Sequence, residues 1–218
     1  LRRLGAKTAQ PLPSAPPTGY DPAALPRWET FTIPGAAGEP LPAQMLRPGD
    51  HLRMYELHPT ESRELAKHFA DVRRGVSIQV ADGFASLKGA VPPPPKRGLV
   101  HIDPPYELKE DYRRVLHSVQ DALGKFPTGV YAIWYPMVAR REAEILPTHL
   151  KKLAPGKWLH VALRVKATAR DGVGLHGSGM FVINPPHTLK ASLEKALPQL
   201  LNVLGRGRGK GQTLDVGG

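Results

Sequence analysis

The sequence predicts an α/β protein whose β-sheet is mostly parallel and is covered by helices on both faces. After the first fifty residues, short apolar runs of strand length alternate with longer stretches in which apolar residues recur at helical spacing. Strands that alternate with helices in this way form parallel sheets with a helical layer on each side. The last two strand-like runs, residues 158–165 and 179–183, are instead joined by a glycine-rich loop with no helical pattern between them. We therefore expect the sheet to close with a strand pair that differs from the rest.

The length and the charge of the chain limit what it can be. Its 218 residues suit one domain with a full hydrophobic core. Thirty Lys and Arg against 19 Asp and Glu give a formal net charge of +11, which favours a polyanionic partner, although a solvated basic surface would give the same composition. The sequence has no cysteine, no ligand spacing among its histidines and no transmembrane or signal segment. We therefore expect no metal site and no membrane partner, and we expect a monomeric, cytoplasmic protein.

Residues 1–50 differ from the rest of the chain. Prolines recur throughout this stretch and interrupt every apolar period, so we expect a largely irregular segment and not a domain. The chain also begins at Leu1 without an initiator methionine, which suggests a fragment, a processed product or a shifted reading frame.

Regular structure is expected beyond that segment. Residues 52–57 carry the apolar pattern of a strand, Thr60 is a suitable N-cap for the helix that follows, and residues 76–80 alternate as the next strand. After a rigid proline run at 92–95, residues 99–102 form a short buried strand. The remaining expected elements are a helix at 108–123 ended by Gly124, a strand at 130–134, a helix at 138–153, the closing strand pair, and a last helix at 188–204 that Pro198 should kink.

The turn Asp103-Pro104-Pro105-Tyr106, which follows the expected strand at 99–102, contains the candidate functional groups. Its two prolines fix φ and remove two backbone donors, so neither a strand nor a helix can continue through them. The strand end therefore offers a carboxylate, a prolyl carbonyl and an aromatic ring at the sheet edge where ligands bind in α/β proteins. A planar amino group suits these partners, because it can donate its hydrogens to the carboxylate and the carbonyl while its nitrogen lone pair stays free to attack.

This tetrapeptide resembles the catalytic signature of S-adenosylmethionine-dependent amino methyltransferases that modify adenine N6. Four further segments support a narrower resemblance: Tyr55-Glu56-Leu57-His58-Pro59, Ala81-Asp82-Gly83-Phe84, Ile133-Trp134-Tyr135-Pro136 and Ser178-Gly179-Met180-Phe181-Val182-Ile183-Asn184-Pro185-Pro186. In their order and spacing, residues 33–204 resemble the bacterial RlmJ family of 23S rRNA adenine-N6 methyltransferases. The resemblance implies a Rossmann-like class I methyltransferase sheet, mostly parallel, in which the closing pair supplies an antiparallel last strand.

The resemblance also implies the catalytic residues. The flipped adenine would stack on Tyr106, its amino group would be held by the Asp103 carboxylate and the Pro104 carbonyl, and its nitrogen would displace the sulfonium methyl group in line. Asn184-Pro185-Pro186-His187 repeats the pattern, and this class of enzyme uses either Asp or Asn at the first position. We favour Asp103, because the catalytic turn normally follows the fourth strand. Asn184 instead follows the closing strand pair and lacks an aromatic residue at the fourth position.

The resemblance implies S-adenosylmethionine as the cofactor. Glu56 would accept its ribose hydroxyls, Asp82 and Gly83 would hold its adenine, and Asp103 would complete the site. Taken without the family, Glu56 is equally an exposed acid at a strand end, and Asp82-Gly83 is equally an ordinary turn.

The chain departs from the family in one respect. Members carry an upstream segment and a first strand ending in a glycine-rich turn, placed between the strand of Glu56 and the strand of Asp103, and no equivalent is found here. Two strand edges would then be unpaired, and each unsatisfied backbone group costs on the order of 1–3 kcal/mol. We expect this first strand to be missing, and we therefore expect weak cofactor binding and a poorly cooperative fold.

We therefore expect an rRNA adenine-N6 methyltransferase, or the C-terminal two-thirds of one, with 23S rRNA as its partner. A DNA or protein-glutamine amino methyltransferase and a catalytically silent RNA-binding fragment stay open as alternatives. The chain would divide into the irregular segment 1–50, a methyltransferase domain at 51–204, and a flexible Gly/basic tail at 205–218 that either contacts RNA or has no role.

Overall fold

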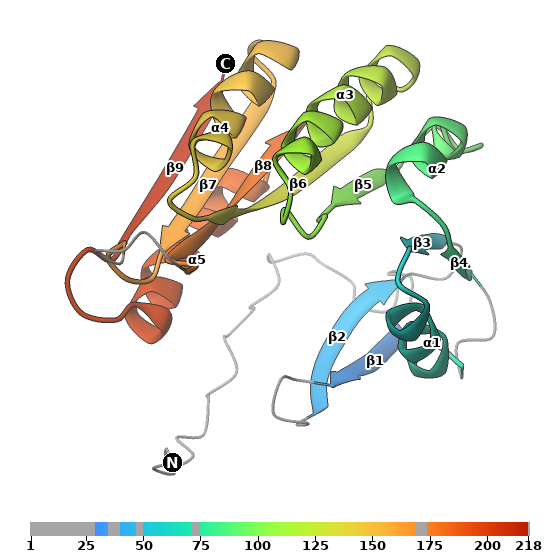
Figure 1. Ribbon diagram of the computed structural model, residues 1–218, viewed down its shortest axis with the longest axis horizontal. Helices are drawn as coiled ribbons and strands as arrows, with labels where there is room; N and C mark the ends of the chain where they lie inside the picture. Colours follow the sequence, from blue (N-terminus) through green and yellow to red (C-terminus); the bar gives the residue numbers. More distant parts are fainter. Residues whose placement is uncertain (1–28, 35–39, 47–49, 71–74, 169–173, 218) are drawn as a thin grey trace, which may run out of the picture. The chain divides into compact units, whose positions relative to one another are not determined.

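The computed structural model describes residues 29–34, 40–46, 50–70, 75–168 and 174–217 (Figure 1). Contacts between residues divide the chain into two compact units, Leu1–Val80 and Ala81–Gly218. The two units are taken separately below. No helix in the described ranges is long and apolar enough to cross a membrane.

The first unit contains two small sheets. β1 (Glu29–Pro34) and β2 (Pro40–Leu46) form an antiparallel pair. The prediction that residues 1–50 are irregular is therefore wrong for these two strands, and the rest of that stretch up to residue 49 lies outside the described residues. The prolines misled the prediction, because both strands of a two-stranded sheet are edge strands, and proline is tolerated at an edge.

The second small sheet is a parallel pair, as the strand–helix–strand pattern predicted. β3 (Leu52–Glu56) pairs with β4 (Val76–Val80), and α1 (Pro59–His68) connects them. The helix begins one residue before Thr60, the predicted N-cap, and His58 occupies the N-cap position instead. Pro59 explains the shift, because its fixed φ suits the first helical position and its missing N–H needs no partner there.

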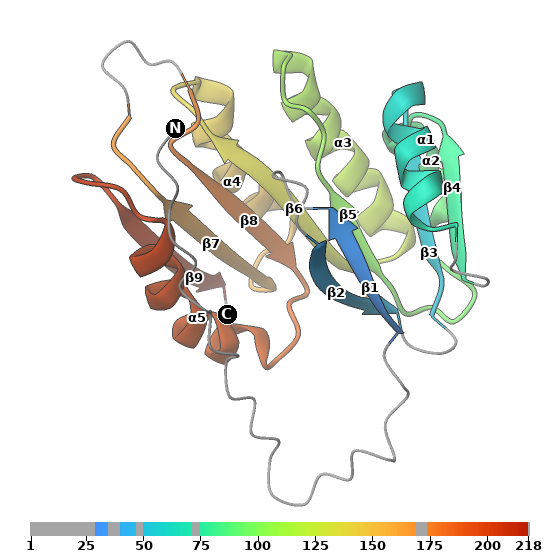
Figure 2. The same cartoon turned by 90° about the horizontal axis from the view of Figure 1, so that it is seen from below.

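The second unit is organised around a five-stranded sheet of order β5-β6-β8-β7-β9 (Figure 2). β5, β6 and β7 are parallel to one another, whereas β8 runs antiparallel between β6 and β7. This arrangement confirms the predicted α/β class and the antiparallel closing pair. The elements of the unit are α2 (Gly83–Ala90), β5 (Leu99–Ile102), α3 (Lys109–Lys125), β6 (Val130–Met137), α4 (Arg141–Leu153), β7 (Trp158–Arg164), β8 (Gly177–Ile183), α5 (Leu189–Leu204) and β9 (Gly211–Gly217).

Three features of this unit differ from the prediction. α2 was not expected, because a glycine at its first position and a proline run after it hide a short helix. α3 continues through Gly124 to Lys125, since Phe126 closes the helix by donating its backbone N–H to Ala122. α4 begins at Arg141, three residues later than predicted.

The C-terminal residues also differ from the prediction of a flexible tail. Residues 211–217 form β9, which pairs antiparallel with β7 along its whole length, from Arg164 opposite Gly211 to Trp158 opposite Gly217. The prediction is therefore wrong for this segment. The glycines on both sides of the strand concealed it, and the partner strand lies about fifty residues earlier, where no local pattern can indicate the pairing.

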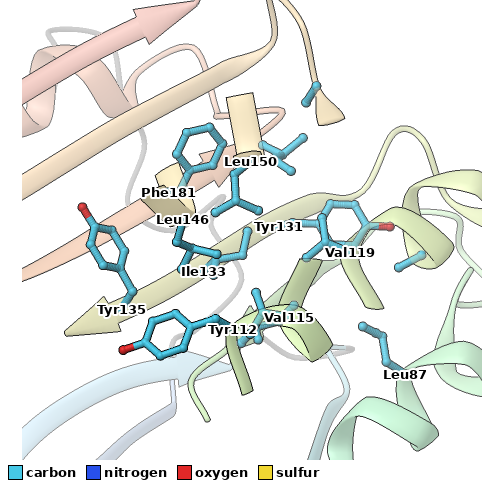
Figure 3. Packing of buried hydrophobic residues seen from close by; sticks show 14 of the residues in the cluster. Leu87, Tyr112, Val115, Val119, Tyr131, Ile133, Tyr135, Leu146, Leu150 and Phe181 are labelled. Carbon is cyan, nitrogen blue, oxygen red and sulfur yellow. The ribbon is translucent and has the colours of Figure 1, made fainter. Parts of the chain in front are cut away.

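The hydrophobic core lies between the sheet and the helices α3 and α4 (Figure 3). α3 contributes Val115 and Val119, and α4 contributes Leu146 and Leu150, all of them essentially inaccessible to solvent. The sheet meets them with Tyr131, Ile133 and Phe181, which are equally buried. α5 packs against β7 and β9. This core fixes the positions of β6 and of its neighbour β5. The predicted catalytic turn directly follows β5.

Among the strands at the sides of the sheets, β3 and β5 bear on the predicted missing strand. β3 pairs with β4, and β5 pairs with β6, so each presents one free edge. The sequence predicted free edges on these same two strands. That a further strand belongs between them stays a prediction.

Candidate active site

The turn after β5 places Asp103 at the carboxyl end of a parallel strand. Ile102 is buried and anchors the strand end, Asp103 is exposed to solvent, and Pro104 is buried again. Partial burial raises the pKa of the Asp103 carboxyl above its usual value, and the nearby His101 opposes this shift. No group in the described residues donates a hydrogen bond to this carboxylate. Its oxygens are therefore available to an incoming donor.

Tyr106 is held in an unusual conformation. Its φ of 53° lies in the left-handed region, which few non-glycine residues adopt. The residue is 4% exposed, its hydroxyl donates to the carbonyl oxygen of Trp134 at 2.6 Å, and its ring centroid lies 4.7 Å from that of Tyr112. Burial is the main reason that the pKa of this hydroxyl is raised. The ring offers almost no free face in this conformation, so the predicted stacking of a base on Tyr106 would require the ring to move.

Arg140 braces the same turn from the other side. It lies between β6 and α4, and its Nη1 donates to the carbonyl oxygens of Tyr106 at 3.2 Å and of Glu107 at 2.9 Å. A cation that bonds two consecutive carbonyls stabilises the left-handed residue between Pro105 and Glu107. Sequence analysis missed this role, because an arginine 34 residues from its partner carries no local signal of the contact.

A hollow of about 430 Å³ adjoins the turn. Its walls are mainly apolar and aromatic, with one acidic and one basic side chain, which is the usual character of a site for a small planar ligand. The segment after β5, the last part of β6 with the residues that follow it, and the segment before β8 each contribute to the lining: Pro105, Tyr106, Glu107, Trp134, Pro136, Val138, Ala139, Arg140, Gly174 and Leu175.

The rival turn at Asn184 has a different structural setting. β8 is antiparallel to β6, and its last residue, Ile183, pairs with Tyr131 near the start of β6. Asn184 therefore lies at the opposite edge of the sheet from Asp103. Its Nδ2 donates to the carbonyl oxygens of Pro127 at 2.8 Å and of Gly129 at 2.7 Å. Both amide hydrogens are thus used to tie β8 to the loop before β6.

Comparisons with known proteins show the family of this chain. The family model described as "Ribosomal RNA large subunit methyltransferase D, RlmJ" matches residues 34–215. The chain belongs to the RlmJ family. The proteins named "Ribosomal RNA large subunit methyltransferase J" from Haemophilus influenzae and Escherichia coli are each 40% identical to it, over 169 and 164 residues. These matches cover 77% and 75% of this chain but only 59% and 58% of the relatives, so the chain spans about three fifths of their length.

A solved structure supports the fold assignment. A Legionella pneumophila protein of known crystal structure superposes with a TM-score of 0.71 at 33% identity, covering 79% of this chain and 62% of the other. The Rossmann-like methyltransferase sheet expected of an RlmJ-family member is therefore confirmed.

The predicted cofactor residues Asp82 and Gly83 lie at the start of α2. Gly83 is the first residue of α2, and Asp82 is its N-cap, with Oδ1 accepting from the backbone N–H groups of Phe84 at 2.9 Å and Ala85 at 3.4 Å. Oδ2 accepts from the guanidinium of Arg114. Partial burial opposes ionisation of Asp82, but these hydrogen bonds outweigh it and lower the pKa of the carboxyl. A carboxylate has about four acceptor positions, so Asp82 can still accept one further donor.

The remaining predicted cofactor residue, Glu56, belongs to the first unit. It is the last residue of β3, and its Oε1 accepts from the backbone N–H of His58 at 2.7 Å. One of the two carboxylate oxygens of Glu56 is therefore already used in a hydrogen bond to the backbone. Binding of ribose by Glu56 stays a prediction.

Proposed function

We propose that this chain acts in the S-adenosylmethionine-dependent methylation of an adenine N6 amino group in 23S rRNA. One observation carries the proposal: the Asp103 carboxylate, which accepts no hydrogen bond from the described residues, lies next to the buried Pro104 at the carboxyl end of β5, beside a hollow with aromatic walls. Membership of the RlmJ family gives this arrangement its reaction class. The chain's net charge of +11 and the names of its relatives favour rRNA over DNA or protein as the substrate.

The proposed role of the turn is to orient the acceptor amine. The Asp103 carboxylate and the Pro104 carbonyl each accept one N–H of the adenine amino group, which leaves the nitrogen lone pair pointing away from the turn. Fixing the amine in this geometry replaces a random encounter by a positioned one, and such positioning contributes several kcal/mol to catalysis. Asp103 is also suited to take up the proton that the nitrogen loses, because its raised pKa makes the carboxylate a better base.

The cofactor, when bound, supplies the electrophilic methyl group. Within the second unit, the residues proposed to hold it are Asp82, with one acceptor position left for an adenine amino group, and Gly83 at the start of α2. Asp103 completes this set. The binding of ribose by Glu56, a residue of the first unit, stays a separate prediction.

The acceptor base is proposed to enter the hollow beside the turn. Trp134 and Pro136 offer flat walls, and Arg140 and Glu107 supply polar groups at the rim. Tyr106 is then proposed to stabilise the turn, because its hydroxyl donates a hydrogen bond to the carbonyl oxygen of Trp134, and not mainly to stack on the base.

The test is transfer of a labelled methyl group. The purified protein is incubated with S-adenosylmethionine labelled in its methyl group and with 23S rRNA, duplex DNA or a glutamine-containing protein, and the products are digested and separated. We expect label in N6-methyladenosine from the rRNA. Label in DNA or in glutamine, or no label in adenosine, would contradict the proposal.

A further inference from the structure

The glycine-rich turn before β9 is docked against the end of β7. The backbone N–H of Arg206 donates to the carbonyl oxygen of Val165 at 2.6 Å. A Cβ at Gly209 would lie 2.8 Å from Ala167, so the two segments are in contact there and only glycine fits. Residues 205–210 thus form a fixed part of the sheet edge.

This docking gathers basic side chains at one place. The end of β7, the residues just after it and the turn before β9 together present five exposed cations, which we call the basic rim: Arg164, Lys166, Arg206, Arg208 and Lys210. No described acidic side chain forms an ion pair with any of the five. Some cations elsewhere are neutralised locally, as Lys151 is by Asp215 and Lys190 by Glu194. Uncompensated like charges repel one another, so the basic rim gains most from a polyanion.

The basic rim lies on the same edge of the sheet as the candidate active site. β5 and β7 are parallel, so their carboxyl ends, after Ile102 and at Arg164, face the same way. β9 is antiparallel to β7 and begins at this edge. Neighbouring strands are about 4.8 Å apart, which places the basic rim roughly 14 to 19 Å from β5 along the sheet. This span is comparable to the length of a few nucleotides along one strand of a nucleic acid.

We propose that the basic rim binds backbone phosphates of the RNA that carries the target adenine, a few nucleotides away from it. The identity of the ligand as RNA rests on the proposed function, whereas the position of the basic rim rests on the described geometry. The glycines at 207 and 209 have φ values of +64° and +81° and alternate with the three cations of the turn. They allow a tight turn in which no bulky side chain separates the cations from a phosphate chain.

The first experiment uses the unmodified protein. Lysine amines are acetylated with an excess of reagent in the presence and absence of an adenosine-containing RNA hairpin, and each lysine is quantified by mass spectrometry. RNA should protect Lys166 and Lys210 but not Lys190 and Lys195, which are exposed on α5. Equal protection of all four, or of the α5 pair alone, would overturn the proposal.

The second experiment uses two variants of equal charge. R208Q/K210Q removes two cations from the basic rim, and K190Q/K195Q removes two from α5. In a fluorescence-anisotropy titration with the labelled hairpin, R208Q/K210Q should lose about tenfold or more in affinity near 0.1 M salt, and its log–log salt slope should fall by about 1.4 to 1.8. K190Q/K195Q should bind within about twofold of the parent protein. A loss that is equal in both variants would show that only total charge matters and would overturn the proposal.

A third variant separates this inference from the proposed function. Asp103→Ala should lose methyl transfer, whereas the RNA hairpin should still protect Lys166 and Lys210 of this variant from acetylation. If the parent methylates adenosine in RNA and R208Q/K210Q binds as the parent does, the basic rim is wrong and the proposed function stands. If RNA protects the basic rim but no adenosine is methylated, the proposed function is wrong and the basic rim stands as an RNA-binding surface.

Discussion

The turns at Asp103 and Asn184 share a sequence pattern but differ in the direction of the strand before them and in the hydrogen bonds of their polar side chains. Each begins with a short polar side chain and continues with two prolines. Asp103 ends a parallel strand and accepts no hydrogen bond from the described residues, whereas Asn184 ends an antiparallel strand and donates both amide hydrogens to backbone carbonyls. Two features thus decide whether such a turn can bind a ligand or stabilises the fold. They are the direction of the strand that precedes it and whether its polar side chain already makes hydrogen bonds within the protein.

The largest expected effect comes from removing the carboxylate. Asp103→Ala should lower methyl transfer to RNA by about 10²- to 10³-fold, the usual loss when a group that stabilises a transition state is deleted. The melting temperature should stay close to that of the parent, because the exposed carboxylate makes no bond within the described protein. Both are measured on the same preparation by radiolabel transfer and by calorimetry. Retention of activity would remove Asp103 from the site.

The corresponding change in the other turn should act on stability instead. Asn184→Ala loses two hydrogen bonds to carbonyls and places a Cβ-bearing residue without them at a φ of 52°, so we expect a loss of about 2–3 kcal/mol in the free energy of unfolding. Asn184→Gly loses the same bonds without the backbone strain and should recover about 1 kcal/mol of this loss. Urea denaturation compares the two. Equal stability of Asn184→Ala and the parent would show that the amide bonds contribute nothing.

The acid limb of the pH profile tests the Asp103 carboxyl directly. This group must be ionised to accept from the amine, and its pKa is raised in the fold. Methyl transfer should therefore decline as the pH falls through a midpoint above the ordinary aspartate value of about 3.9, by about tenfold for each pH unit below the midpoint. Single-turnover rates measured over a range of pH give the midpoint. A flat acid limb down to the ordinary value would contradict the role of the carboxylate as acceptor.

Arg140 offers a matched pair of variants for the support of the active turn. Arg140→Gln shortens the side chain and removes the charge that bonds the Tyr106 and Glu107 carbonyls, and we expect methyl transfer to fall about tenfold because the turn becomes less well positioned. Arg141→Gln makes the same chemical change at an exposed neighbour and should have little effect. Initial rates at saturating RNA distinguish the two. Equal rates for both variants would show that the brace is dispensable.

The smallest effect is expected at the Tyr106 hydroxyl. Tyr106→Phe removes the bond to the Trp134 carbonyl and should cost about 0.5–1.5 kcal/mol of stability, whereas Tyr106→Ala also empties a buried ring site and should cost about 3–5 kcal/mol. Thermal denaturation of both variants gives the two values. Similar losses for Phe and Ala would mean that the hydroxyl bond, and not the ring, stabilises the turn.

Sequence analysis predicted those parts of this comparison that depend on local pattern. The apolar run before Asp103, the two prolines and the closing strand pair are all readable from neighbouring residues, and the structure confirms the strands. The bonds of Asn184 to Pro127 and Gly129, and of Arg140 to Tyr106, join residues more than thirty positions apart, and no period in the chain encodes them. β9 was missed for the same reason, since its strand character depends on pairing with β7.

The position of β8 between β6 and β7 has a consequence for biosynthesis. During translation β7 emerges before β8, but it cannot join β6 until β8 has been made and has taken its place between them. The carboxyl end of the sheet, where Asp103 lies, is therefore completed only after β8 has been made. β9 is made later still and brings the cations of the turn that precedes it. At about 5–20 residues per second the segment from β8 through β9 takes only a few seconds to synthesise. The nascent chain would thus acquire its proposed RNA-binding surface only after β9 has been made and has paired with β7.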